Sequence, residues 1–162
     1  MKFIDPRQDA WRTLDGEDGP LTHPSPTGHA LLTLAQWHAV RETWPDTLPT
    51  GVIVPNDADL DALAVDLPRL ALVALQFPKW TDGRAYSQAF LLRARLGFEG
   101  EIRATGDVLV DMLPLLRRCG FDAVQLRADQ SRQTALATLD QFPGHYQGDA
   151  SGAKPVFHGL VA

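Results

Sequence analysis

Three consecutive strand–helix units constrain the fold of this 162-residue chain more than any other feature of its sequence. Each unit joins a short apolar run, a polar turn and a segment whose apolar residues recur at helical spacing, and the units lie at 71–96, 101–119 and 123–142. Strands that alternate with helices in this way are parallel and are joined by right-handed crossovers. The sequence therefore predicts an α/β fold built on a parallel sheet.

The preceding residues add one more unit of the same kind. Residues 51–54 form a short apolar run that predicts a buried strand, and 58–65 predict a short acidic helix capped by Asp57. Amphipathic spacing over 29–44 predicts another helix. Pro114 removes a backbone donor, so the helix of 107–119 should break between Val110 and Pro114, with Asp111 as a second cap.

Two architectures fit four parallel units: half of a (β/α)₈ barrel, and a small open parallel sheet with helices on both faces. In the strand at 101–105, polar residues alternate with Ile102 and Ala104, so that one face is polar and the other apolar. Strands of a doubly wound sheet are usually apolar on both faces. The alternation favours the half-barrel, with a concave side that forms a pocket or is covered in a homodimer.

Glycine and proline divide the rest of the chain. We expect residues 1–28 to be a loose leader, with short edge strands near Phe3 and Trp11. A single α/β domain then spans 29–147, and a flexible tail follows at 148–162.

Charge and composition exclude several classes of function. The net charge is −5, and residues 1–70 contain 5 basic and 11 acidic groups, so we expect no nucleic-acid partner. No apolar run reaches the ~18 residues of a membrane span, and the first residues lack the apolar region of a signal peptide, which makes a cytoplasmic protein the expectation. No metal site is expected from the five histidines and Cys119, and no nucleotide or flavin motif is present, so no cofactor is evident.

The turn that follows the strand at 71–77 is the first candidate site. Lys79 and Arg84 flank the start of a helix, where free amides attract anions. Gly83 would allow close backbone approach or an unusual torsion, Asp82 could cap the helix, and Tyr86 and Ser87 open it. The alternative is that Asp82 is a cap alone and that both cations are exposed to solvent.

The next two strands contribute further charged residues. Arg103 and Asp107 belong to the second unit, and Arg127 and Asp129 follow the third strand. Because the carboxyl ends of parallel strands lie on one rim, Lys79, Arg84, Arg103 and Arg127 could face a common anion-binding space. The alternative is a ring of structural Arg–Asp pairs that fixes the loops.

Three blocks of this sequence resemble an uncharacterised bacterial family, domain of unknown function 934. The blocks are the segment Phe77 to Ser87, the segment Gly106 to Leu109 and the segment Leu116 to Ala123, within a likeness that spans about residues 30–148. Trp80 differs from the phenylalanine that is commoner in the family. Family members are often labelled oxidoreductases involved in sulfite reduction, and the resemblance implies a pathway without implying a catalytic residue or a cofactor.

These observations lead to two expectations of function. The first is an accessory protein of assimilatory sulfite or nitrite reduction, which binds a reductase partner or an oxyanion at the rim around residues 79–87. The second is an oxidoreductase or other enzyme of sulfur assimilation, in which Lys79 or Arg84 holds an anionic substrate while Asp82 or Asp107 transfers a proton.

Overall fold

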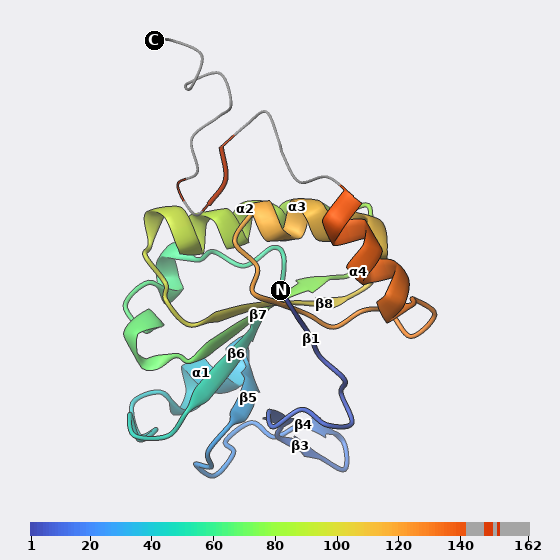
Figure 1. Ribbon diagram of the computed structural model, residues 1–162. Helices are drawn as coiled ribbons and strands as arrows, with labels where there is room; N and C mark the ends of the chain where they lie inside the picture. The colour runs from blue at the N-terminus through green and yellow to red at the C-terminus, as the bar shows by residue number, and fades with distance from the viewer. Residues whose placement is uncertain (142–147, 151, 153–162) are drawn as a thin grey trace.

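Five strands that follow one another in the chain form the middle of one parallel sheet (Figure 1). They are β5 (Ala30–Thr33), β6 (Thr50–Val54), β7 (Leu72–Phe77), β8 (Glu101–Gly106) and β9 (Ala123–Val124). The two ends of the sheet are completed by β1 (Lys2–Phe3) beside β9 and β2 (Arg12–Thr13) beside β5. This computed structural model describes residues 1–141, 148–150 and 152.

Three helices connect successive strands, a fourth follows the last strand, and all four lie on the convex side of a sheet that curls into a half-barrel. They are α1 (Leu34–Val40), α2 (Arg84–Phe90), α3 (Leu113–Arg118) and α4 (Arg132–Gln141). Shorter turns of helix are η1 (Asp61–Leu63), η2 (Leu67–Arg69), the π-helical η3 (Leu91–Arg95) and η4 (Val110–Met112). A two-stranded hairpin, β3 (Asp15–Gly16) with β4 (Gly19–Pro20), stands apart from the sheet. Of the two expected architectures, the chain therefore adopts the half-barrel.

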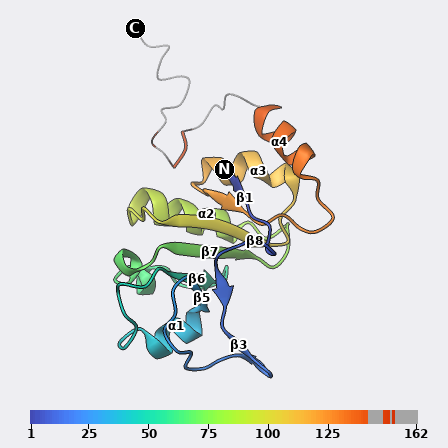
Figure 2. The same ribbon diagram turned by 60° about the horizontal axis from the view of Figure 1, so that its bottom comes forward.

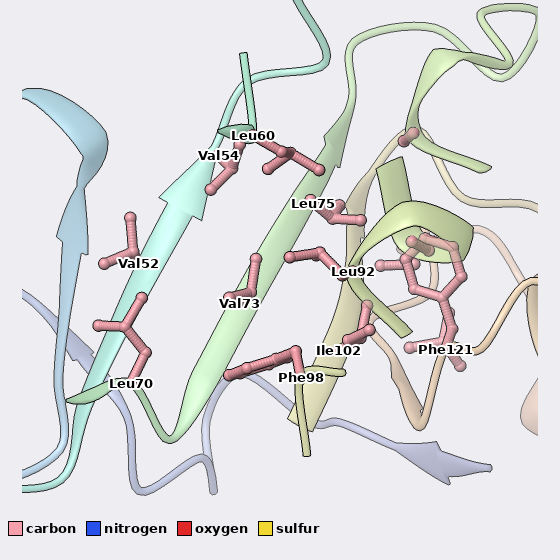
Figure 3. Packing of buried hydrophobic residues seen from close by; sticks show 14 of the residues in the cluster. Val52, Val54, Leu60, Leu70, Val73, Leu75, Leu92, Phe98, Ile102 and Phe121 are labelled. Carbon is pink, nitrogen blue, oxygen red and sulfur yellow. The ribbon is translucent and has the colours of Figure 1, made fainter. Parts of the chain in front are cut away.

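The main core lies between the sheet and the helices. Alternate residues of neighbouring strands, such as Val52, Val73 and Ile102, point to the same side and pack against Leu92 and other helical residues (Figure 3). All four of these side chains are fully buried. Burial of an aliphatic side chain contributes roughly 1.5–3 kcal/mol, so this layer supplies much of the stability of the fold.

The concave face of the sheet is crossed by the chain's own N-terminal segment. Because β1 and β2 lie at opposite edges, residues 4–11 must pass from one edge to the other, and Figure 2 shows this passage from β1 toward β3. Arg103 points to this face from the middle of β8 and is 3% exposed. Its guanidinium bonds to Asp9 of the crossing segment and to Glu101, while Lys2 also reaches Glu101 at 3.0 Å.

The leader predicted at 1–28 thus contributes two strands to the main sheet, close to the expected positions near Phe3 and Trp11. We call residues 4–11 the N-terminal strap. Its carboxylate at Asp9 pairs with the side of the buried Arg103 guanidinium that Glu101 does not reach, and an unpaired donor there would cost free energy.

The helix predicted over 29–44 is wrong in its first part, because residues 30–33 form β5. Ala30 and Leu32 are fully buried in the core, and β5 pairs with β6 along its whole length. Thr33 then forms a capping box with Gln36, which fixes the start of α1 at residue 34. Pairing with neighbouring strands decided the conformation of a segment whose local pattern also suits a helix.

Other boundaries differ in smaller ways. The acidic helix predicted over 58–65 is reduced to η1, and Asp111 does not cap α3, whose N-cap is Met112. The predicted break before Pro114 is confirmed, since η4 ends there and Pro114 lies in the first turn of α3. The predicted helix end at Pro143 falls outside the described residues, as does most of the predicted tail at 148–162. No helix in the described part of the chain has both the length and the apolar character needed to cross a bilayer.

The strap predicts a specific loss of stability. Asp9→Ala leaves one side of the buried Arg103 guanidinium without an acceptor, and we expect the free energy of unfolding to fall by about 1–3 kcal/mol in urea denaturation. Asp5→Ala is the matched control, because Asp5 pairs with the largely exposed Arg7 of the same strap. Equal unfolding curves for wild type and Asp9→Ala would contradict the account of the strap.

Candidate functional site

The polar turns that follow β7, β8 and β9 meet at the carboxyl edge of the sheet. Phe77 at the end of β7 pairs with Gly106 at the end of β8, so that the turns after these strands begin side by side. Gly106 has a φ of 93°, and a Cβ atom there would collide with the carbonyl oxygen of Phe77. We call residues 79–84 together with Asp107, Arg127 and Asp129 the strand-end rim.

Asp107 holds the rim together. One carboxylate oxygen accepts a hydrogen bond from the backbone N–H of Trp80 at 3.0 Å, and the other accepts one from Nη1 of Arg127 at 2.7 Å. Arg127 also donates from Nε and Nη2 to both oxygens of Asp129, at 2.7 and 2.8 Å. A single side chain therefore links the turns of three neighbouring strands.

These contacts shift the pKa values of the carboxyl groups downward. The Trp80 amide, followed by Arg127, lowers the pKa of Asp107. The fork of hydrogen bonds from Arg127 lowers the pKa of Asp129 to about 2. Each carboxylate is stabilised in its ionised form, as expected where a charged group accepts bonds from a cation and an amide.

Asp82 and Arg84 form a second ion pair on the rim. Arg84 donates to the Asp82 carboxylate from Nε at 3.0 Å and from Nη2 at 2.7 Å, and this contact holds the pKa of Asp82 far below its usual value. Gly83 is the N-cap of α2 and has ordinary backbone angles. A Cβ atom at Gly83 would make only a van der Waals contact with Tyr86, so the special torsion expected at this glycine is not required.

The predicted site residues do not all lie together. Lys79 is exposed on the rim, with no ion-pair partner among the described residues. Arg103 lies in the middle of β8, under the N-terminal strap. The alternation of a strand predicts which face a residue occupies, and it does not predict how far the residue lies from the strand end. The structure therefore brings Lys79, Arg84 and Arg127 to the rim and leaves Arg103 out.

Tyr86 and Ser87 belong to a different surface. Both line a groove on the outer side of α2 that also includes Cys119. The Tyr86 ring packs edge-on against Phe77 at 5.2 Å, and burial raises the pKa of Tyr86 to about 12. Burial also raises the pKa of the Cys119 thiol, as it does for a cysteine in apolar surroundings.

One residue of the rim and one residue beside it were missed in the sequence. Trp80 lies in the turn itself and has a side chain that is 54% exposed, although large aromatic residues seldom occur in exposed polar turns. Asn56 follows β6, is buried, and lies close enough to Asp82 to contribute to its lowered pKa, while its Nδ2 lacks a hydrogen bond of normal geometry. The available signal for Trp80 was a large aromatic residue in a polar turn, next to Lys79 and Thr81. No such signal in the sequence pointed to Asn56.

Ion pairs dominate the chemistry of the rim. The pKa values of Asp82, Asp107 and Asp129 are all shifted away from neutrality, so these groups are ionised throughout the physiological range. Within the described residues, no three His, Cys, Asp or Glu side chains are grouped so as to hold a metal ion. Such an arrangement suits recognition by fixed charges better than proton transfer.

Fold and rim together define a parallel α/β half-barrel whose strand ends are tied by arginine–aspartate pairs. Residues 51–157 match the family described as bacterial protein of unknown function (DUF934), and the chain belongs to this family. The match begins at β6, so β5, α1 and the N-terminal strap precede the matched region. A search of the curated proteins finds no match.

The rim predicts coupled carboxyl titrations. In Arg127→Gln, the pKa of Asp129 should rise from about 2 toward its ordinary value of 3.8, and the pKa of Asp107 should rise with it, as measured by NMR of the carboxyl carbons. Asp82, which is paired with Arg84, is the internal control and should not change.

The same substitution predicts a pH dependence of stability. A folded-state pKa below the unfolded value stabilises the protein above the unfolded pKa, and this contribution is lost as the pH falls through the folded pKa. Wild type should therefore be more stable than Arg127→Gln at pH 7, with a difference that shrinks between about pH 4 and pH 2. An Asp129 pKa that stays near 2 in the variant would contradict the assigned cause.

Proposed function

We propose that this protein is a non-catalytic accessory protein of sulfite or nitrite reduction that docks a reductase partner through the strand-end rim. The observation that carries the proposal is the state of Trp80, whose indole is half exposed while its backbone is fixed by Asp107. Tryptophan and arginine are enriched among the residues that dominate binding energy in protein interfaces. Arg84 and Arg127 belong to the same rim as Trp80.

Rigidity supports a docking role for this tryptophan. Asp107 bonds to the Trp80 amide, and Asp82 donates its own amide to the Lys79 carbonyl at 3.0 Å, so the turn is held on both sides of the indole. A side chain whose backbone is already ordered loses less conformational entropy when it binds. The rim thus presents an apolar anchor surrounded by fixed charges, as protein-binding surfaces commonly do.

The charges favour a protein partner over a small oxyanion. The guanidinium groups of Arg84 and Arg127 each already bind an ionised carboxylate, which an oxyanion such as sulfite would have to displace. Lys79 is the remaining rim cation, and a single exposed ammonium group binds anions weakly. A reductase partner can instead contact the outer sides of the ion pairs while it covers Trp80.

The enzyme alternative receives less support from the same geometry. It assigns proton transfer to Asp82 or Asp107, whose pKa values are lowered by Arg84 and by Trp80 with Arg127. A carboxylate held in its ionised form is a poor general acid and a weak base near neutral pH.

The pathway is taken from the family resemblance. Members of domain of unknown function 934 are often labelled with sulfite reduction, and the segment from Phe77 to Ser87, which contains Trp80, carries much of that likeness. The segment that identifies the family is therefore also the segment that forms the proposed docking surface.

Removal of the Trp80 side chain should weaken partner binding. We expect Trp80→Ala to raise the Kd for a purified assimilatory sulfite reductase by about 30-fold or more, the loss typical of a tryptophan at the centre of an interface, as measured by biolayer interferometry. Val65→Ala is the matched control, since Val65 is 77% exposed and lies outside the rim.

Calorimetry with sulfite separates the two kinds of ligand. The proposal expects reductase binding and no measurable heat when sulfite is titrated into the protein alone. Sulfite binding that is lost in Arg84→Ala, together with no binding of the reductase, would contradict a docking role and favour an anion site.

A further inference from the structure

A large open groove lies outside the strand-end rim, along the outer face of α2 and beside the end of α3. It has a volume of about 560 Å³, and it is lined by Tyr86, Ser87, Phe90, Leu91, Arg95 and Cys119. Figures 1 and 2 both show α2 and α3 side by side on the same side of the sheet. None of these residues contributes to the ion pairs of the rim.

The helical register explains why the groove is apolar along its length. Tyr86 and Phe90 are four residues apart on α2, and so are Ser87 and Leu91, so each pair shares a face. Phe90 is 49% exposed, an unusual state for a phenylalanine on a helix. On α3, Leu115 lies one turn before Cys119 and is also exposed.

A π-helical turn forms one end of the groove. The N–H of Leu96 donates to the carbonyl of Leu91 at 2.9 Å, five residues earlier, and the wide turn covers residues 91–95. Single π-helical turns inside helices occur frequently at functional sites. Arg95 projects from this turn into the lining of the groove.

Arg95 differs from most arginines of this protein. Arg41, Arg84, Arg93 and Arg127 each pair with a carboxylate, whereas Arg95 has no hydrogen-bond or ion-pair partner within the described part of the chain. Its guanidinium is exposed next to an apolar strip whose lining residues include no carboxylate. Among the described residues, the groove therefore offers an apolar surface and one positive charge that has no carboxylate partner.

We propose that this groove binds an amphipathic helix of a partner protein that carries a glutamate or aspartate beside its apolar face. An open groove covers a small ligand on one side only, whereas ligand pockets bury most of their ligand. A helix laid along the groove can place apolar residues on Phe90 and Leu91 while its carboxylate pairs with Arg95. A second copy of this chain that presented the same face would offer Arg95 no carboxylate from the groove lining.

The test uses a designed peptide, so it does not depend on the rim or on the pathway. The probe is a helical peptide of about 18 residues with leucine at positions i, i+3, i+4 and i+7 and glutamate beside them. A second peptide has lysine in place of each glutamate. Binding to the full chain is measured by fluorescence anisotropy, and chemical-shift changes in NMR spectra locate the bound peptide.

We expect the glutamate peptide to bind more tightly than the lysine peptide and to shift the amides of residues 86–95. Phe90→Ser should raise its Kd about tenfold or more, and Arg95→Glu should reverse the preference in favour of the lysine peptide. Leu136→Ser is the matched control, because Leu136 is also 49% exposed but lies on α4 outside the groove, and it should leave both Kd values unchanged.

Three results would overturn the proposal. The first is that wild type and Arg95→Glu each bind the glutamate peptide and the lysine peptide with the same Kd. The second is that neither peptide binds at millimolar concentration. The third is a wild-type dimer, detected by analytical ultracentrifugation, that Phe90→Ser converts to a monomer, since the groove would then hold a second copy.

Discussion

The carboxylate of Asp107 is the contact on which the proposed function depends. It accepts one hydrogen bond from the Trp80 backbone and one from Arg127, and so joins the turns after β7, β8 and β9. The turns can meet there because β7 and β8 pair in register to their last residues, Phe77 and Gly106. Packing of the strands brings the loops together, and one charged side chain then fixes their conformation. The backbone of an exposed tryptophan is thereby held in one conformation.

Half of a barrel leaves one face of its sheet without helices, and this chain covers that face with its own N-terminal strap. The crossing segment joins the two edges of the sheet and places Asp9 on the buried Arg103. The strap explains how a curled sheet with a charged residue on its concave side can be stable without the second half of a barrel. It also occupies the face through which a homodimer was expected, and it leaves the carboxyl edge and the outer helices as the surfaces open to partners.

Local patterns in the sequence predicted the central strands and the helices α2 to α4 because apolar spacing and Gly97, Gly120 and Pro114 act over a few residues. They failed at β5, where pairing with β6 outweighed a pattern that also suits a helix. Local patterns also did not predict which strand a two-residue strand such as β1 pairs with. On the rim, the two members of each ion pair, Asp82–Arg84 and Arg127–Asp129, are only two residues apart in the sequence. The alternative that these residues form structural Arg–Asp pairs describes them well. The bridge from Asp107 to Trp80 joins residues 27 positions apart and has no local signal.

Hydrogen exchange of the Trp80 backbone amide tests this account most directly. The amide donates to Asp107 in the folded protein and should exchange slowly for a residue in an exposed turn. In Asp107→Ala, we predict that the Trp80 amide exchanges much faster while the amide of Leu75 in the middle of β7 keeps its protection, because the sheet does not depend on the rim. An unchanged exchange rate at Trp80 would show that Asp107 does not hold the turn, and would contradict the claim that this carboxylate organises the site.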